Sequence, residues 1–216
     1  MLLALDTSTP SVTAAVHDGT RVLAEATIVD ARRHGELLAG QVAQVLAEAG
    51  LTPADLTAIA VGVGPGPFTG LRVGVVTALT LGLALSVPVH GVCSLDALAW
   101  RAVVDGPFVV ATDARRREVY WARYDTGGGR LGPAGVCKPA DLAAELGGLP
   151  VVGPGAELYA DVFGGVVGAC APLSAGALAE VALAALASGA ALLPARPLYL
   201  RRPDATPPGP RKPVLA

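Results

Sequence analysis

Two parts of the chain repeat the same order of features, and this repeat restricts the fold more than any other property of the sequence. In the first part, an apolar run ends at Asp6, a polar loop follows, and a second strand-like run leads to Asp18, twelve positions later. In the second part, Asp113 and Asp125 stand at the same twelve-residue spacing around the strand-like run 119–124. Asp18 is followed by glycine, which is typical of a β-hairpin turn. We interpret the pattern as a degenerate internal repeat.

Further strands and helices are expected after each hairpin. They are a strand at 21–29, a helix at 34–49, a strand at 59–63, a helix at 71–85, a strand at 87–92, a helix at 95–103, a strand at 151–152, and helices near 157–163 and at 174–188. The alternation predicts an α/β protein with two similar lobes. Two copies of strand, aspartate, loop and strand describe the duplicated fold shared by actin, hexokinase and the Hsp70 ATPase domain. We place the lobes at 1–104 and 105–202, with a flexible proline-rich tail at 203–216.

The composition limits the classes of function. Hydrophobic residues make up 52% of the chain, which is ample for a core. The formal net charge is −2, whereas a protein that holds RNA by itself usually carries a positive excess, so a link to nucleic acid would run through a partner. The cysteines Cys93, Cys137 and Cys170 are odd in number and lack CxxC spacing, which argues against a disulfide framework. The first residues also lack the basic region of a signal peptide, so we expect a cytoplasmic protein.

The stretch 71–89 has about the length of a membrane span and carries Arg72 as its only charge. Thr77, Thr80 and Ser86 interrupt it, and a turn rich in glycine and proline precedes it. We therefore expect a buried or interface helix and no membrane association.

The loop from Gly64 to Arg72 follows a strand and opens this helix. Free backbone N–H groups and the helix dipole make such a position attractive to anions. Glycines in the same place also let two backbones pass closely, and this second interpretation is favoured. The loop lacks the Gly-Lys-Ser/Thr end of a Walker A motif.

The two repeated aspartates are candidate site residues. Asp6 stands at a strand end before three hydroxyl residues, and a magnesium or phosphate contact and an Asx turn explain this position equally well. Asp113 is followed by Ala114 and then by the run Arg115-Arg116-Arg117. Bulky side chains would crowd a backbone cradle for phosphate, so a solvated hairpin tip is favoured there. The sequence assigns the three arginines no role.

Several stretches, in their order and spacing, resemble the TsaB (YeaZ) family. They are Leu5–Thr9, Arg33–Leu38, Gly64–Arg72, Ser94–Ala99, Asp113–Arg115 with Glu118–Tyr120, and Pro197–Arg201. The likeness extends from Leu2 to about Arg202, and the Gly64–Arg72 loop is its most specific part. The family more often has serine where this chain has Gly35 and Pro67.

The resemblance implies a non-catalytic scaffold. Proteins of this family pair with a TsaD-like paralogue that transfers threonylcarbamoyl to N6 of adenosine in tRNA, and a TsaE-like ATPase joins them. The resemblance thus implies a heterodimer that meets tRNA only through the complex, and it implies no cofactor. Whether two copies form a homodimer without the partner is left open.

The resemblance also implies which residues form the partner interface. The family pairs through its two N-terminal helices, here 34–49 and 71–85, which would form a four-helix contact. The expected interface residues are His34, Leu37, Leu38, Gln41, Val42, Val45, Arg72, Val76 and Leu79. The alternative is that both helices cover their own sheet.

A vestigial nucleotide site is the other implication. The metal-binding histidines of TsaD-like paralogues align with Ser94 and Leu98, and their phosphate loop aligns with Asp113-Ala114-Arg115. Leucine cannot ligate a metal ion, so the metal is expected to be absent. The paralogues have Ser-Gly-Gly in the phosphate loop, so the second phosphate clamp is expected to be absent as well. The candidate residues of the vestigial site are Asp6, Ser8, Asp113, Gly153 and Gly155.

Two catalytic alternatives compete with the scaffold. The first is an active ATP-dependent small-molecule transferase or kinase of the same fold. The second is a metallopeptidase, which the sequence disfavours because His17, His34 and His90 form no HxxxH or HExxH pair.

Overall fold

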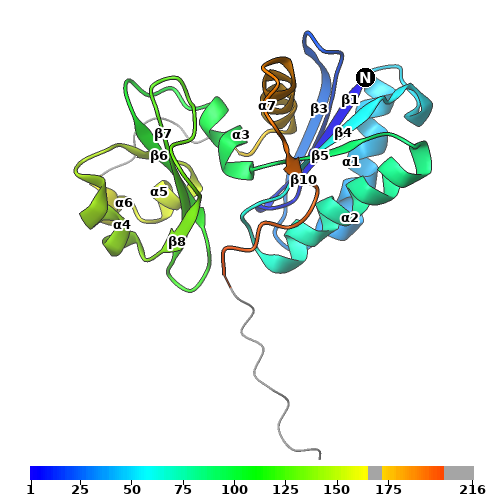
Figure 1. The fold of residues 1–216 in the computed structure, drawn as a ribbon. Coiled ribbons are helices and arrows are strands. Elements are labelled where there is room, and N and C mark those ends of the chain that lie inside the picture. Colours follow the sequence, from blue (N-terminus) through cyan, green and yellow to red (C-terminus); the bar gives the residue numbers. More distant parts are fainter. Residues whose placement is uncertain (165–171, 202–216) are drawn as a thin grey trace, which may run out of the picture.

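The predicted N-terminal hairpin is present in the computed structural model, which describes residues 1–164 and 172–201 (Figure 1). The first sheet contains the strands β1 (Leu2–Asp6), β2 (Ser11–His17), β3 (Val22–Val29), β4 (Ala58–Gly62), β5 (Val89–Val92) and β10 (Leu193–Pro194). Their order is β10-β5-β4-β1-β2-β3. β1 pairs antiparallel with β2 and parallel with β4, so the hairpin and the crossover strands meet at β1.

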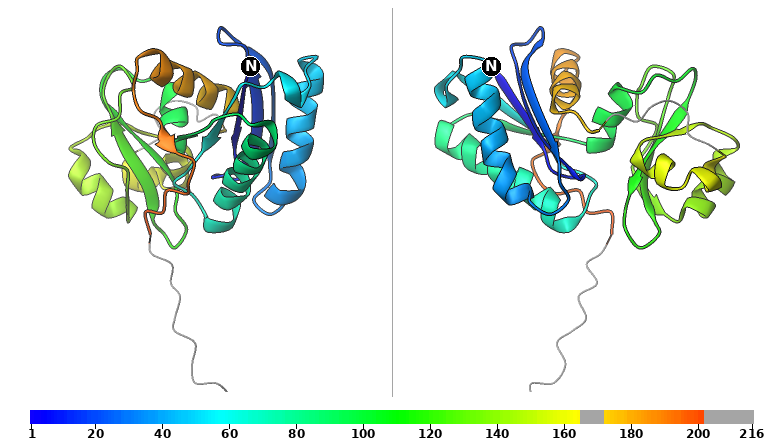
Figure 2. Two further views of the ribbon diagram at one scale, coloured as in Figure 1. Left: turned by 45° about the vertical axis from the view of Figure 1, so that its right-hand side comes forward. Right: turned by 180° about the vertical axis from the view of Figure 1, so that it is seen from behind.

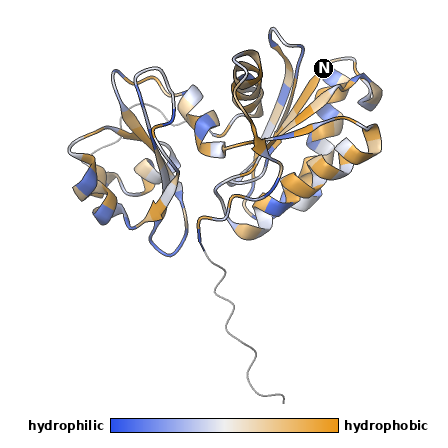
Figure 3. Ribbon diagram, viewed as in Figure 1, coloured by the Kyte–Doolittle hydropathy of each residue, from blue (hydrophilic) through white to orange (hydrophobic). Residues whose placement is uncertain are grey.

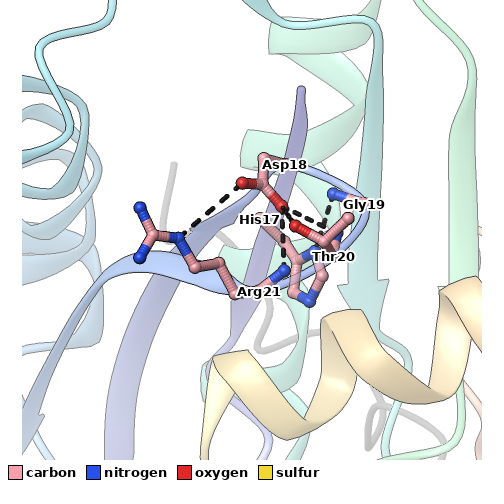
Figure 4. A network of polar contacts seen from close by, with 5 residues as sticks. All are labelled: His17, Asp18, Gly19, Thr20 and Arg21. Atoms are coloured by element: carbon pink, nitrogen blue, oxygen red, sulfur yellow. Dashed lines mark hydrogen bonds and ion pairs between the residues drawn. The ribbon is translucent and has the colours of Figure 1, made fainter.

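The turn between β2 and β3 shows why Asp18-Gly19 predicts a hairpin (Figure 4). Gly19 has a φ of 101°, a conformation that glycine adopts readily. One carboxylate oxygen of Asp18 accepts hydrogen bonds from the Thr20 amide at 2.7 Å, the Thr20 hydroxyl at 2.6 Å and the Arg21 amide at 2.8 Å. The hydrogen bonds from Thr20 and Arg21 lower the pKa of this carboxyl. The turn is therefore held by local polar contacts.

Helices cover both faces of the first sheet (Figure 2). They are α1 (His34–Glu48), α2 (Phe68–Leu85) and α7 (Ala175–Ala187). A short 3₁₀ turn, η1 (Pro53–Asp55), precedes β4, and α3 (Ser94–Trp100) packs between α7 and the second sheet. Side chains alternate along β1, so Leu3 and Leu5 pack with α1 and α2, whereas Leu2 and Ala4 pack with α7. Each face of the sheet thus has its own apolar layer.

The second lobe repeats the topology of the first. Its sheet contains β6 (Phe108–Asp113), β7 (Val119–Tyr124), β8 (Gly135–Cys137) and β9 (Val151–Val152) in the order β8-β7-β6-β9. Like β1, β6 pairs antiparallel with the next strand and parallel with the strand that follows the helical connection. The helices of this lobe are α4 (Pro139–Leu146), α5 (Pro154–Leu158) and α6 (Ala160–Phe163). The internal repeat predicted from the two aspartates is therefore present in the fold.

The structure contains secondary-structure elements and pairings that were not predicted from the sequence. β8 and α4 lie in a stretch for which no element was expected. Although the C-terminal lobe was expected to span 105–202, α7 packs on the first sheet and β10 pairs antiparallel with β5. The chain therefore returns to the first lobe after the second. The expected tail at 203–216 lies outside the described residues.

Candidate functional site

Asp6 lies at the end of β1, in a cluster with Ser8 and Ser94 that is closed to solvent. One carboxylate oxygen accepts from the Ser8 amide at 2.6 Å and from the Ser8 hydroxyl at 2.8 Å, which is an Asx turn. The other accepts from the Ser94 hydroxyl at 2.5 Å, and the Ser94 oxygen in turn accepts from the Gly64 amide at 3.1 Å. Both oxygens of Asp6 are thus committed to protein donors.

Glycine makes room for this buried carboxylate. A Cβ at Gly62 would lie 1.6 Å from one carboxylate oxygen of Asp6. Burial raises the pKa of Asp6 above its ordinary 3.8, while hydrogen bonds from Ser94 and Ser8 oppose the shift. The arrangement ties the loop after β1 to the start of α3.

The pH dependence of stability tests this arrangement. Because the folded pKa of Asp6 is raised, its contribution to stability is fully present below the unfolded pKa and is lost as pH rises through the folded pKa. We expect the free energy of unfolding of the wild-type chain, compared with that of the Asp6→Asn variant, to decrease as the pH rises from acidic to neutral. Urea unfolding at several pH values measures this difference. A relative stability that rises with pH would mean that the serine hydrogen bonds outweigh burial.

The loop from Gly64 to Arg72 packs directly on the loop after β1. A Cβ at Gly66 would lie 2.1 Å from the Ser8 carbonyl oxygen, and one at Gly70 would lie 2.7 Å from the Thr7 carbonyl oxygen. The Thr7 hydroxyl donates to the Gly70 carbonyl at 2.7 Å and accepts from the Gly74 amide at 2.8 Å. These contacts agree with the favoured interpretation of the loop, in which glycines let two backbones pass closely.

Helix α2 exposes several large apolar side chains to solvent. Its buried face contains Gly70, Gly74, Ala78 and Gly82 at every fourth position, which lets the helix approach the sheet closely, together with Leu71 and Val75. The outer stripe consists of Phe68, Arg72, Val76, Leu79 and Leu83. Val76 is 59% exposed, Leu79 46% and Leu83 84%. Figure 3 shows that hydrophobic residues predominate along the whole helix.

By length and composition α2 is also the only helix within residues 1–164 and 172–201 that could cross a membrane. A third of it is buried inside the protein. The chain itself leaves Val76, Leu79 and Leu83 of the outer stripe exposed.

Helix α1, unlike α2, turns its large apolar side chains toward the sheet of its own lobe. Leu38, Gln41, Val42 and Val45 were expected in the partner interface, but they are buried against the sheet of their own lobe. Apolar residues at this spacing form the face that covers β2 and β3, which agrees with the alternative in which this helix covers its own sheet. Leu37 and His34 remain half-buried, and the His34 ring donates to the Thr9 carbonyl at 2.8 Å.

The second repeated aspartate lies at a strained hairpin tip. Asp113 accepts from the Arg115 amide at 2.7 Å and forms an ion pair with the Arg115 guanidinium at 3.3 Å. Arg115, Arg116 and Arg117 have φ values of 60°, 56° and 60°, which are uncommon for residues with a side chain. The tip thus presents three arginines where a phosphate cradle of this fold would need glycine.

The structure brings some predicted site residues together and separates others. Asp6 and Ser8 are hydrogen-bonded, whereas Asp113 bonds neither of them within the described residues. Gly153 and Gly155 pack on β6, since a Cβ at these positions would lie 2.5 Å and 2.8 Å from backbone atoms of Ala111. The five candidate residues of the vestigial site therefore form two groups: Asp6 and Ser8 lie in the first lobe, and Asp113, Gly153 and Gly155 lie on or against β6 in the second.

Two cavities flank the loop from Gly64 to Arg72. Their volumes are about 310 and 370 Å³, and Pro67, Phe68 and Arg115 line both. The arginine tip of the second lobe therefore reaches the loop of the first. Phe68 and Tyr199, which lines the larger cavity, were not among the expected site residues. The sequence could have indicated Tyr199 as a site residue, because it lies in the Pro197–Arg201 stretch that carries the family resemblance.

The Cys93 thiol is buried, whereas Cys137 is partly exposed. Burial raises the pKa of the Cys93 thiol to about 12, so it is not a reactive thiolate at neutral pH. In residues 1–164 and 172–201, no three His, Cys, Asp or Glu side chains come together in a way that would hold a metal ion. Cys170 lies outside the described residues.

The chain is similar in sequence to a known protein family and to several known proteins. A family model described as "TsaD: tRNA N6-adenosine threonylcarbamoyltransferase" matches residues 21–160. An uncharacterized protein of Mycobacterium tuberculosis is 47% identical over 211 residues, which cover 95% of this chain and 94% of that protein. The tRNA threonylcarbamoyladenosine biosynthesis protein TsaB of Escherichia coli is 36% identical over 126 residues, which cover 57% of this chain and 54% of that protein.

A solved structure is similar over nearly the whole chain. YeaZ from Pseudomonas aeruginosa superposes with a TM-score of 0.78 at 33% identity, covering 92% of this chain and 99% of that one. The two-lobed α/β fold predicted from the repeat is confirmed by this likeness and by the two sheets described above.

Proposed function

Because the chain belongs to the TsaB (YeaZ) family, we propose that it is the non-catalytic partner subunit of the complex that transfers threonylcarbamoyl to N6 of adenosine in tRNA. Its partners in this proposal are a TsaD-like catalytic paralogue, with which it forms a heterodimer, and a TsaE-like ATPase. The chain meets tRNA only through the complex and acts in the cytoplasm.

The observation that carries the partner role is the outer stripe of α2. Val76, Leu79 and Leu83 form a contiguous apolar surface on a helix that is already packed against its own sheet. Exposed apolar patches of this kind usually mark an interface. We propose that the TsaD-like paralogue covers this stripe. The buried inner face argues against a membrane-spanning role for α2, because it holds the helix on the first lobe.

The Asp6 cluster supports the non-catalytic assignment. An aspartate that contacts magnesium must be accessible to the ion, but Asp6 is buried and both of its oxygens accept hydrogen bonds from Ser8 and Ser94. At the matching place in the second lobe, arginine side chains occupy the hairpin tip.

Reconstitution tests this proposal. The chain is combined with the TsaD-like and TsaE-like proteins of its own organism, unmodified tRNA, Mg²⁺-ATP and threonylcarbamoyl adenylate as the donor, and threonylcarbamoyladenosine is measured in the tRNA by nucleoside mass spectrometry. We expect no product without the chain, and the same rate within about twofold for a folded Asp113→Asn variant, because this carboxylate takes no part in the reaction.

Two results would contradict the proposal. Full activity without the chain would remove it from the complex. Turnover of Mg²⁺-ATP by the isolated chain, lost in Asp113→Asn, would favour the ATP-dependent transferase instead. Depletion of the protein in its host provides a second measurement, in which an unchanged nucleoside level would contradict the role in tRNA modification.

A further inference from the structure

The last described segment of the chain, residues 193–201, connects three parts of the molecule, and we call it the C-terminal strap. It begins with β10, which pairs with β5 at the edge of the first sheet. The Leu198 amide then donates to the Val63 carbonyl at 2.8 Å. Figure 1 shows the strap running from β10 down between the two lobes. The strap is therefore anchored on the first lobe at β10 and at Leu198.

Tyr199 holds the first turn of α2. Its ring stacks on Phe68 with centroids 5.4 Å apart and planes inclined by 23°. Its hydroxyl accepts a hydrogen bond from Arg72 Nε at 2.7 Å, and the Arg72 guanidinium lies 3.7 Å from the centre of the Phe68 ring. Arg72 belongs to the outer stripe of α2, so the strap determines the orientation of its only charged member.

Arg201 reaches across to the second lobe. It donates to the Ala114 carbonyl at 3.1 Å and forms an ion pair with Glu118. Ala114 and Glu118 form the base of the arginine tip, where the Ala114 amide donates to the Glu118 carbonyl at 2.9 Å. Two residues of the strap thus connect α2 with the hairpin of the other lobe.

We propose that the C-terminal strap positions the partner-facing surface, with Tyr199 and Arg201 as positioning residues that act through Arg72 and through the second-lobe hairpin. An arginine that is already held in one orientation loses less conformational freedom when the partner binds. The inference rests on the proposed function, because the surface that the strap positions is the one proposed to bind the TsaD-like paralogue.

A double-mutant cycle tests the action of Tyr199 through Arg72. The variants are Tyr199→Phe, Arg72→Gln and their combination, and calorimetry measures the Kd for the paralogue. Phenylalanine keeps the ring stacking and removes the hydrogen-bond acceptor, so we expect about fivefold weaker binding in the wild-type background. In the Arg72→Gln background the same change should have less than about a twofold effect. Tyr159→Phe is the matched control and should bind like the wild type.

Equal effects of Tyr199→Phe in both backgrounds would overturn the proposal, because Tyr199 would then act independently of Arg72. A wild-type affinity in Tyr199→Phe would overturn it as well.

Hydrogen exchange of the isolated chain tests the Arg201 contact without any partner. In Arg201→Gln we expect amides of the segment 113–119 to exchange about tenfold faster, since their tie to the strap is lost. The amides of β1 and β2 should be unchanged, which serves as the internal control, and Arg101→Gln should leave both regions unchanged. Unaltered exchange at 113–119 would show that the strap does not hold the second lobe.

The two measurements separate the two proposals. If the wild-type chain does not bind the paralogue, the proposed function fails, and hydrogen exchange alone decides whether the strap joins the lobes. If the wild-type chain binds but the effects of Tyr199→Phe and Arg72→Gln on the Kd are additive, the proposed function stands and the positioning role fails.

Discussion

Replacement of both Val76 and Leu79 by arginine is expected to abolish association with the TsaD-like paralogue, while the isolated chain stays folded. Both side chains are exposed, so charge at these positions costs little in the free protein. In the complex the two charges would be buried without partners, which should weaken binding by at least about 100-fold. Calorimetry of the purified pair measures the loss, and circular dichroism reports on the fold.

Two controls make this experiment specific. Val103, which is 92% exposed and lies outside α2, offers a matched valine, and Val103→Arg should bind normally. Leu38 is 1% exposed on α1, and Leu38→Arg should unfold the first lobe, because a charge would enter its core. Tight binding by the Val76→Arg, Leu79→Arg variant would mean that the partner covers another surface.

The substitution Gly66→Ala is expected to destabilise the first lobe strongly. The added Cβ would lie 2.1 Å from the Ser8 carbonyl oxygen, a backbone atom that cannot move without displacing the loop after β1. We expect a loss of about 2–4 kcal/mol in the free energy of unfolding. Urea denaturation followed by circular dichroism measures this loss.

Gly40→Ala is the matched control for Gly66→Ala. Gly40 lies within α1, and a Cβ there would have no neighbour within 4 Å. Alanine should therefore stabilise the chain by up to about 1 kcal/mol through its helix propensity. If both substitutions have the same small effect, the close approach of the two loops does not contribute to stability.

Much of the fold follows from local sequence patterns. The hairpins at Asp18 and at 114–118, the strands beside them and the long helices lie close to their expected positions. β8 and α4 were missed, because the segment 126–150 is rich in glycine and proline and shows only a short apolar period. The return of α7 and β10 to the first sheet was also missed, since a local pattern does not specify which sheet an element joins.

The candidate site was less predictable than the fold. Gly64–Arg72 was identified as a close crossover from its glycines, and the contacts with Thr7 and Ser8 agree with that interpretation. The two interpretations of Asp6 could not be separated from the sequence. The structure favours the Asx turn, since Ser8 and Ser94 occupy both carboxylate oxygens.

The sequence by itself determined the two-lobed repeat, the family and the apolar character of α2, because these depend on residue types and their spacing along the chain. Only the tertiary structure decided which side chains are open to a partner. Leu38 on α1 and Val76 on α2 are both apolar residues of helices. Leu38 packs against the sheet, whereas Val76 is exposed to solvent. Likewise, Asp6 and Ser94 are 88 residues apart, and their hydrogen bond exists because β1 and β5 flank β4, where Gly62 leaves room for the two side chains to meet. Burial and long-range pairing are properties of packing, and packing depends on neighbours that the local sequence does not specify.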